Sequence, residues 1–457
     1  MRIKLEVFLT VNEIIKFTDG KVGSEVSAER IEWIATDSRE VRSGDLFIAL
    51  KGDRFDGAEH IGEAVLSGGI VLSTVECKHG IKVGDTKKAL SEIARLYKSK
   101  LKKLKYTVAV TGSVGKSTAK EFVSVIFAEH FRVASTIGNY NNIIGVCLSV
   151  LSAARDTEVL VLELGMNHRG EIAELSRIIE PDLSIITNIG TSHIGNLGSR
   201  EEIALAKLEI TEGMKEVRLV LPYGESLLPY ERAISFSVND SRADYFLEYN
   251  YGSVDLYYAK RRILTGEFRI NERHLTECLA PALAAACELG VPISRIKSGM
   301  EKIKRDSIRQ KYIHFPGFTI YSDCYNASVE SISAALAHIG AQKQYPSKSA
   351  VLGCVMELGE MSIPIHREIG RIAAGGGLNR LYLFGEFAEE IKLGAIHSGF
   401  DESKIFLSPE ADPHSAIAVE ILKEHSPGEL ILLKGSRATR PELVILHLEE
   451  ITNKKEG

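Results

Sequence analysis

Short apolar runs alternate with amphipathic stretches from about residue 106 onward, and this alternation predicts parallel sheets covered by helices. The first series of runs is Val108–Val110, Val159–Leu162, Leu183–Ile186 and Leu219–Leu221. Each run is short and almost wholly apolar, which is typical of strands that are buried on both faces. A helix is expected over 120–128, behind the glycine-rich turn that follows the first run.

A second series of the same kind begins near residue 317. The expected strands are Phe318–Tyr321, Ala350–Leu352, Leu381–Phe384 and Leu430–Leu433. The expected helices are 328–338, 365–374, 386–395, 414–424 and the C-terminal segment. Strands and helices that alternate in this way are typical of an α/β domain, so the chain is expected to contain a second one.

The first hundred residues mix short strands and helices. The run Asp45–Leu50 is expected to form a buried strand, and turn residues follow it at 52–53 and 56–57. The basic run Lys98–Lys105 predicts a solvated helix end before a domain boundary. At ~150 residues per domain the chain is long enough for three α/β domains. The expected boundaries are 1–105, 106–308 and 309–457.

Composition narrows the class of protein. Hydrophobic residues make up 44% and charged residues 26% of the 457 residues, which lets each domain bury an ordinary core. A formal net charge of -5 argues against general nucleic-acid binding, which depends on clustered Lys and Arg. No apolar stretch approaches the ~20 residues of a membrane span, and Met1–Glu6 does not begin a signal peptide. The six cysteines lack the spacing of a zinc site or a disulfide framework, so a soluble cytoplasmic protein is expected.

The segment Thr111–Thr118 has the residues of a phosphate loop. It reads Thr-Gly-Ser-Val-Gly-Lys-Ser-Thr, between an expected strand and an expected helix. Glycines let the backbone approach phosphate groups, and the amides at the start of the helix face their charge. Lys116 can neutralise phosphate oxygens and the Ser117 hydroxyl can reach Mg²⁺. The two glycines are two residues closer together than in the general Gly-x-x-x-x-Gly-Lys motif. The alternative interpretation is a glycine turn between a strand and a helix that happens to carry a lysine.

Two further side chains suit a metal site. Glu163 follows one apolar run and His193 comes after another, which places both at the carboxyl edge of a parallel sheet. Open α/β folds bind ligands at that edge, and a carboxylate, a hydroxyl and an imidazole there can hold Mg²⁺. Because His is an unusual ligand of Mg²⁺, a polar core role is the alternative for His193. Lys207, in a helix of charged and apolar residues, would by itself be interpreted as an ordinary surface lysine.

The shortened phosphate loop resembles that of the Mur ligase family, and other segments are similar to that family's motifs in the same order. In the N-terminal region Thr36–Arg39, Gly44–Phe47 and Asp56–Gly57 resemble the uridine-nucleotide domain. In the middle, the family's Asn-rich substrate loop is similar to Gly138–Gly145, and its segment with a magnesium-binding Glu is similar to Glu163–Asn167 together with Gly170–Ile172. The family's segment with a magnesium-binding His is similar to Thr187–His193, and its segment with a carbamylated lysine is similar to Ala206–Ile210. The C-terminal region is similar to the branch of the family that adds D-alanyl-D-alanine, at Asp323–Ala327, Met356–Glu360, His366 and Lys434–Arg437.

The resemblance implies a role for each domain. A small mixed α/β N-terminal domain would bind the UDP end of a nucleotide-sugar, a central P-loop parallel-sheet ATPase domain would bind ATP and Mg²⁺, and a C-terminal Rossmann-like α/β domain would bring the amine. The residues expected to bind ATP are Gly112, Ser113, Gly115, Lys116, Ser117, Thr118, His274, Arg309 and Asp323. Those expected to bind the substrates are Ser38, Arg39, Asn139, Asn141, Asn142, Tyr325, Asn326, Lys434 and Ser436. The expected ligands of two magnesium ions are Ser117, Glu163, His193 and Lys207 as a carbamate, and the expected catalytic residues are Lys116, His193 and Lys207.

The activity that the resemblance implies is ATP-dependent ligation of an acid to an amino acid in cell-wall precursor synthesis. A peptide carboxylate on a UDP-linked sugar would attack the γ-phosphate to give an acyl phosphate. The amine of an amino acid, or of a dipeptide such as D-alanyl-D-alanine, would then displace phosphate. Such chemistry needs fixed positive charge opposite the phosphoryl group. The enzyme is expected to be a monomer without nucleic-acid or membrane partners.

The chain differs from the family in motifs near the adenine, which the family's asparagines help to frame. Leu275 and Cys278 stand where the family carries two asparagines in His-Asn-x-x-Asn, and Ser322–Val329 departs from Asp-Asp-x-Tyr-Asn-Ala-Asn-Pro. Neither Leu nor Cys offers a strong hydrogen bond to a base, so looser nucleotide selectivity is expected. The departures leave alternatives open: a ligase of an archaeal pseudomurein pathway, a related ligase with another acceptor, and a non-catalytic ATP-binding regulator.

Overall fold

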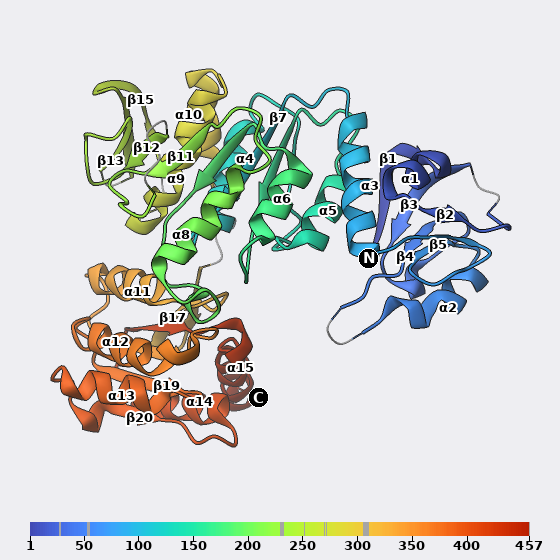
Figure 1. Ribbon diagram of the computed structural model, residues 1–457. Helices are drawn as coiled ribbons and strands as arrows, with labels where there is room; N and C mark the ends of the chain where they lie inside the picture. Colours follow the sequence, from blue (N-terminus) through green and yellow to red (C-terminus); the bar gives the residue numbers. More distant parts are fainter. Residues whose placement is uncertain are drawn as a thin grey trace. The chain divides into compact units, whose positions relative to one another are not determined.

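The computed structural model describes residues 1–26, 29–52, 55–228, 233–250, 252–268, 270, 272–304 and 310–456. They form three β-sheets with flanking helices (Figure 1), which confirms the expected α/β class. Contacts group the chain into two compact units. The first unit comprises 1–187, 205–269 and 277–303, and the second comprises 188–204, 270–276 and 304–457.

The first sheet has six strands in the order β1-β3-β4-β5-β6-β2, of which β3 to β6 are parallel. Its strands are β1 Arg2–Thr10, β2 Lys21–Val22, β3 Arg30–Ala35, β4 Leu46–Ile48, β5 Ile70–Ser73 and β6 Gly80–Lys82, and the helices of this region are α1 Val11–Thr18, α2 Ile61–Leu66 and α3 Thr86–Lys100. The strand expected over 45–50 is confirmed as β4. Asp45 lies just outside it, where its carboxylate accepts hydrogen bonds from the Arg2 guanidinium at 2.7 Å and from Arg42 N–H at 2.9 Å.

The end of α3 is less solvated than its basic sequence suggests. Lys98 Nζ donates to the main-chain oxygens of Ile179 and of Glu180, the latter at 3.4 Å. These oxygens lie at the C-terminal end of a helix, where a cation is favoured. Burial lowers the pKa of Lys98, so the expectation of a solvated side chain is wrong at this position. It is confirmed for Lys102 and Lys103, which are exposed.

The central sheet has nine strands in the order β15-β14-β13-β12-β11-β10-β7-β9-β8. They are β7 Tyr106–Thr111, β8 Val133–Ser135, β9 Val159–Glu163, β10 Leu183–Ile186, β11 Leu219–Pro222, β12 Ile234–Ser237, β13 Tyr245–Asn250, β14 Ser253–Tyr258 and β15 Arg261–Glu267. The helices of this region are α4 Lys116–Phe127, α5 Ile143–Leu151, α6 Glu171–Ile179, α7 Ile194–Leu197, α8 Arg200–Leu208, α9 Arg273–Glu288 and α10 Ile293–Lys302.

The four strands expected in this region are confirmed as β7, β9, β10 and β11. The antiparallel strands β13 to β15 were not predicted from the sequence. Their buried positions alternate with more exposed ones, so they lack the continuous apolar run that marked the other strands. Strand β7 lies between β10 and β9, parallel to both. The carboxyl ends of these three strands therefore meet at one edge, which is where the phosphate loop begins.

The third sheet has six strands in the order β16-β17-β21-β18-β19-β20, all parallel except β16. They are β16 Lys311–Phe315, β17 Phe318–Asp323, β18 Lys348–Gly353, β19 Arg380–Phe384, β20 Ile405–Leu407 and β21 Glu429–Lys434. Its helices are α11 Val329–Ala341, α12 Ser362–Ala374, α13 Ala388–His397, α14 Pro413–Glu424 and α15 Leu443–Glu456. The four strands and five helices expected here are confirmed, with shifts of a few residues at their ends.

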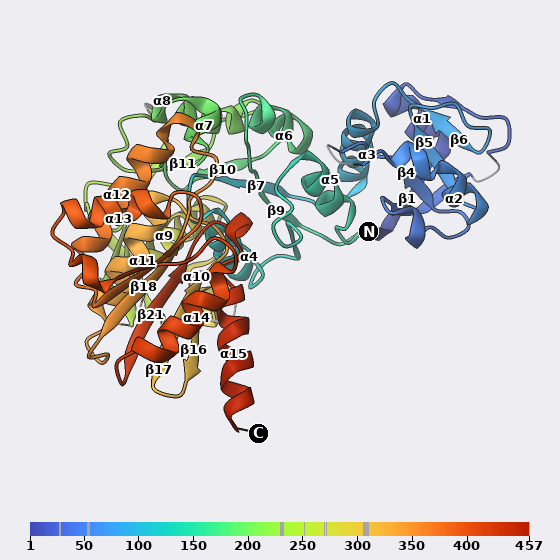
Figure 2. The ribbon, with the colours of Figure 1, turned by 90° about the horizontal axis from the view of Figure 1, so that it is seen from below.

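Helices cover both faces of the third sheet. Figure 2 shows α14 and α15 on one side of the strands and α11 to α13 on the other. The first face holds a buried cluster in which Ile417, Ile421 and Leu448 pack against Ile320 and Ile431. Because both faces are covered, β17, β18, β19 and β21 are buried at nearly every position and mostly apolar, which is why the sequence pattern could locate them.

His366 of α12 is buried in this fold as a neutral ring. Its Nδ1 lies 2.6 Å from Ser362 O, and its Nε2 accepts Val355 N–H at 3.0 Å. A ring that accepts through Nε2 and donates through Nδ1 carries one proton. Burial lowers the pKa of His366 from its ordinary value.

Acid should therefore destabilise the protein through His366. A histidine in the unfolded chain titrates near pH 6.5, so the unfolded state takes up the proton first as the pH falls below that value. Stability that is fully present above pH ~6.5 is then lost toward the folded pKa, by at most about 1.4 kcal/mol per pH unit. Urea midpoints at two pH values on either side of ~6.5 measure this dependence. His366→Asn should reduce it, whereas His397→Asn, at an exposed site, should keep it. Equal dependence in wild type and His366→Asn would contradict the expectation.

Candidate active site

Two glycines shape the phosphate loop between β7 and α4. Gly115 has φ +82° and caps the N-terminus of α4. Gly112 has φ +148°, and a β-carbon there would lie 1.9 Å from Thr187 Oγ1. The Thr187 hydroxyl in turn donates to Val114 O at 2.6 Å. The residue that follows β10 therefore holds the loop and leaves room only for glycine at its start.

Lys116 points back into this loop. Its Nζ donates to Gly112 O at 2.7 Å and to Ser113 O at 3.2 Å. Helix α4 begins at Lys116, four residues before the expected start, and Ser117 and Thr118 lie in its first turn. The amides of a first helical turn can bind anions, so this lysine and these amides together suit a phosphate group.

The carboxylate of Glu163 connects the loop to its neighbours. Glu163 ends β9 with 2% of its surface exposed. Its Oε2 accepts the Ser117 hydroxyl at 2.6 Å, and its Oε1 accepts the Asn141 amide at 2.8 Å. Its own N–H donates to Thr136 Oγ1 at 2.7 Å. A carboxylate and a hydroxyl in contact are hard oxygen donors of the kind that Mg²⁺ takes.

The Asn-rich segment before α5 lies beside Glu163. Asn142 caps α5, since its Oδ1 accepts Gly145 N–H at 2.9 Å. Asn141 holds Glu163, and Gly165 leaves room for it, because a β-carbon there would lie 2.6 Å from Asn141 Cγ. Asn139 is half-buried in the same segment. Two of the three asparagines expected to bind substrate therefore also build the site.

Lys207 of α8 is buried, with 1% of its surface exposed. Burial, and to a smaller extent the charge of Lys116, lower its pKa well below the ordinary value. The interpretation as an ordinary surface lysine is therefore wrong. The sequence signal that was available is the apolar face of this helical segment, since Ala206 and Ile210 beside Lys207 are fully buried.

In the second unit, Asp323 and Lys434 end the neighbouring strands β17 and β21 and are register partners. Lys434 has 1% of its surface exposed, and its Nζ donates to Asp323 Oδ2 at 2.6 Å and to Asn326 O at 3.0 Å. The Asn326 side chain accepts Ala327 N–H at 2.9 Å. The ammonium of Lys434 thus holds the segment after β17.

The same edge carries the other residues predicted for the C-terminal region. Ser436 Oγ accepts Met356 N–H at 3.1 Å. The Arg437 guanidinium carbon lies 5.9 Å from the centre of the Tyr325 ring. The structure therefore brings together, at the carboxyl ends of β17, β18 and β21, residues that are far apart in the sequence.

His193 also belongs to the second unit. It precedes α7 with φ +66°, and its Nδ1 lies 2.6 Å from Glu357 Oε2. Sequence reasoning singled out the Met356–Glu360 segment but not the pairing of Glu357 with His193. No local pattern predicts that pairing, because it joins segments more than a hundred residues apart.

The adenine-side residues are only partly described. Arg309 and the side chain of His274 lie outside the described residues, and Leu275 is buried. Cys278 packs behind the phosphate loop, where its Sγ lies 3.8 Å from Gly115 O. Burial raises the pKa of this thiol to about 12. Looser selectivity for the base stays a prediction.

In the first sheet the residues predicted for the nucleotide-sugar lie at a short turn after β3. The Ser38 hydroxyl is buried and donates to Glu63 Oε2 at 2.6 Å. The exposed Arg39 guanidinium is held by both oxygens of Asp37, at 2.8 and 2.7 Å. A guanidinium fixed in this way presents its remaining N–H groups outward.

Among the described residues, no three or more His, Cys, Asp or Glu side chains lie close enough together to hold a metal ion. Mg²⁺ does not require one, since it usually keeps several waters and takes one or two carboxylates together with substrate phosphates. Ser117 and Glu163 fit that pattern. Nowhere in the described part of the chain is a helix both long and apolar enough to cross a membrane.

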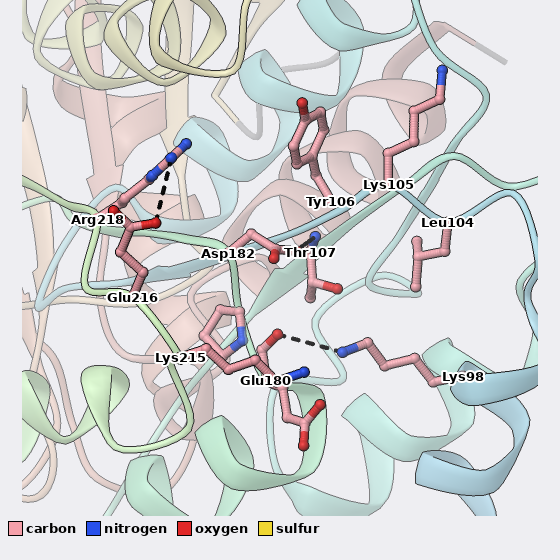
Figure 3. Close-up of a pocket in the computed structure, with 11 residues that line it drawn as sticks. Lys98, Leu104, Lys105, Tyr106, Thr107, Glu180, Asp182, Lys215, Glu216 and Arg218 are labelled. Carbon is pink, nitrogen blue, oxygen red and sulfur yellow. Dashed lines mark hydrogen bonds and ion pairs between the residues drawn. The ribbon is translucent and has the colours of Figure 1, made fainter.

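A hollow of about 410 Å³ lies at the opposite end of the central strands, where β7, β10 and β11 begin (Figure 3). Its charged side chains are partly paired. Arg218 lies 3.5 Å from Glu216, and Asp182 accepts Thr107 N–H at 2.7 Å. The phosphate loop is at the other end of β7, so this hollow is separate from the candidate active site.

A phosphate loop at the carboxyl edge of a parallel sheet, with a buried carboxylate against its serine, defines a phosphate-loop α/β protein. Three family models match the chain: the Mur ligase family catalytic domain over 30–98, the Mur ligase middle domain over 110–255, and the Mur ligase, glutamate ligase domain over 308–437. The chain belongs to the Mur ligase family.

Individual relatives agree with this assignment. The UDP-N-acetylmuramoyl-tripeptide–D-alanyl-D-alanine ligase of Bacillus subtilis (strain 168) is 33% identical over 96% of this chain and 98% of its own length. A crystal structure of MurF from Acinetobacter baumannii matches 98% of this chain and 100% of its own with a TM-score of 0.86 at 27% identity. MurF ligase from Thermotoga maritima, solved in complex with ADP, matches 92% of this chain and 98% of its own with a TM-score of 0.78 at 30% identity.

Gly112→Ala should disable nucleotide binding. The new methyl group would collide with Thr187 Oγ1, and the backbone angle disfavours any side chain. We expect ADP affinity to fall roughly tenfold or more, a loss of at least about 1.4 kcal/mol. Isothermal titration measures it. Gly84→Ala, where a β-carbon meets no atom within 4 Å, is the matched control and should bind as wild type does. Unchanged affinity in Gly112→Ala would show that the loop does not hold the phosphates.

Proposed function

We propose that this protein is an ATP-dependent ligase that joins D-alanyl-D-alanine to a UDP-N-acetylmuramoyl-tripeptide. The observation that carries the proposal is the end-to-end similarity to the Bacillus subtilis ligase of that name, over 96% of this chain and 98% of the relative. The phosphate loop, the buried Glu163 and the buried Lys207 support it, because phosphoryl transfer depends on positioned charge.

Each region takes one part of the task in this proposal. Residues 1–105 bind the UDP end of the acceptor, with the fixed Arg39 guanidinium as a candidate contact to its phosphates. Residues 106–308 bind ATP. Residues 309–457 bind the incoming dipeptide at the edge that carries Tyr325, Asn326 and Ser436.

The reaction proceeds in two steps. A carboxylate oxygen of the tripeptide attacks the γ-phosphorus of ATP, the bond to the bridging oxygen breaks, and ADP leaves with the electron pair. The amine of the dipeptide then attacks the acyl carbon, the bond to the phosphate oxygen breaks, and the amine loses a proton as the amide forms. Lys116 and the amides at the start of α4 hold the charge that the phosphoryl group carries during the first step.

We propose Ser117, Glu163 and His193 as magnesium ligands. Bound Mg²⁺ would supply charge neutralisation at the phosphate oxygens. In the protein itself, Glu163 accepts the Ser117 hydroxyl and so keeps that oxygen oriented before any ion arrives.

Lys207 is proposed to carry a carbamate. Carbamylation requires a neutral amine, because its lone pair forms the bond to the carbon of CO₂ while one proton leaves. Burial lowers the pKa of Lys207, which favours the neutral amine that this step needs. The product is an anion, which the charge of Lys116 would favour, whereas the same charge disfavours a protonated Lys207.

The direct test supplies ATP, UDP-N-acetylmuramoyl-tripeptide and D-alanyl-D-alanine, and measures phosphate release together with the mass of the product. We expect stoichiometric phosphate and a product equal to the two substrates less one water. Lys116→Ala should slow the reaction roughly 10²- to 10³-fold or more, because the phosphoryl charge loses a fixed counter-ion. Lys102→Ala, at an exposed lysine, should keep wild-type turnover.

Other outcomes of this assay separate the alternatives. A product formed only with another amine, or only with another sugar-peptide, would assign the chain to a different acceptor. ATP binding without product for any pair would favour a non-catalytic regulator. Wild-type turnover in Lys116→Ala would contradict the phosphate-loop assignment.

Lys207→Ala should be nearly inactive if the carbamate is required. Short carboxylates such as acetate should then restore part of its turnover, because they supply the missing anion, and should not accelerate wild type. Carbon-13 NMR of wild type in labelled bicarbonate should show one carbamate signal that is absent from Lys207→Ala. Full activity in the variant, or no carbamate in active wild type, would contradict the assignment.

A further inference from the structure

The segment 188–204, which carries His193, groups by its contacts with residues 304–457 and not with the strands that precede it. Its first anchor is Glu330 near the start of α11. Thr191 N–H donates to Glu330 Oε1 at 2.8 Å, and the Thr191 hydroxyl lies 3.3 Å from Oε2. Gly190 leaves room for this carboxylate, because a β-carbon there would lie 2.8 Å from Glu330 Cδ.

The second anchor is the turn Glu357–Gly359. Gly195 N–H donates to Glu357 O at 3.1 Å. A β-carbon on Gly195 would lie 2.5 Å from Gly359 N, so the two backbones meet without intervening side chains. The segment is therefore anchored to residues 304–457 on both sides of His193.

Between these anchors the His193 ring faces one carboxylate. His193 Nδ1 lies 2.6 Å from Glu357 Oε2, with side chains that are 20% and 49% exposed. Nδ1 is buried, and its close approach to Oε2 is not aligned as a hydrogen bond. Both residues have left-handed backbone, φ +66° for His193 and φ +64° for Glu357. Among residues other than Gly this conformation is uncommon, although Asn, Asp and His adopt it more often, so Glu357 is the more unusual of the two. Uncommon backbone conformations cluster at functional sites.

We propose that Glu357 is a positioning residue, which holds Nδ1 of His193 so that Nε2 is the ring nitrogen presented to a divalent cation. Histidines that bind metals commonly present their second ring nitrogen to a carboxylate, which fixes the ring and raises its basicity. This inference rests on the proposed function only in taking His193 as a metal ligand. It adds that metal binding depends on a carboxylate from the turn after β18.

The test measures binding of Mn²⁺, a paramagnetic substitute for Mg²⁺, to the full-length protein with ADP by electron paramagnetic resonance. Removal of a carboxylate that orients a ligating histidine weakens metal binding by roughly 10- to 100-fold. We expect that loss in Glu357→Ala and a smaller one in Glu357→Gln, which keeps the shape but not the charge. Glu360→Ala, at the exposed glutamate that directly follows this turn, is the matched control and should bind as wild type does. Thermal unfolding and metal-free ADP binding should be unchanged in all three.

A double-mutant cycle shows whether Glu357 acts through His193. Residues that act as one unit are not additive, so Glu357→Ala should weaken Mn²⁺ binding no further once His193→Ala is present. If Glu357→Ala lowered Mn²⁺ affinity equally in wild type and in His193→Ala, the inference would be overturned, because Glu357 would then act on metal binding without His193. Unchanged Mn²⁺ affinity in Glu357→Ala would overturn it too. If His193→Ala itself binds Mn²⁺ as wild type does, the metal assignment in the proposed function fails instead.

Discussion

The candidate nucleotide site depends on one buried carboxylate. A charge removed from water is costly unless hydrogen bonds replace its solvation, and Glu163 receives them from Ser117 and Asn141. These bonds tie the first turn of α4, the segment before α5 and the end of β9 into one arrangement. A change in any of the three leaves the carboxylate short of a partner, so the phosphate loop and the Asn-rich segment are not independent motifs.

The sequence predicted the parallel strands well because they are covered on both faces. Strands β10 and β21 are buried at every position, and β21 has an unbroken apolar run between Glu429 and Lys434. Such runs can be recognised without knowing which segments cover them. The hairpins β13 to β15 are half-exposed, so their pattern is alternation interrupted by polar residues. The start of α4 was placed four residues late because the left-handed Gly115 lets the helix follow the loop at once, and helical periodicity alone does not show this.

The candidate site was predictable in its residues but not in its pairings. The motif order located Lys116, Glu163 and His193. The burial of Lys207 had only a local signal, the apolar residues Ala206 and Ile210 beside it, which the interpretation as a surface lysine left unused. The carboxylates that meet His193 and Lys434 could not be predicted, since the closeness of two residues more than a hundred positions apart is a property of the topology.

The pairing of β17 with β21 has a consequence for synthesis of the chain. The two strands are adjacent in the sheet, yet Asp323 and Lys434 are separated by 111 residues. Until Lys434 leaves the ribosome, β17 and β18 lack the strand that lies between them and expose unpaired backbone edges. Parallel pairings over such separations form late and leave partly folded chains prone to association. The edge that joins Asp323 to Lys434 is therefore among the last parts of the protein to form, and a chain that stops shortly before β21 lacks Lys434 and Ser436.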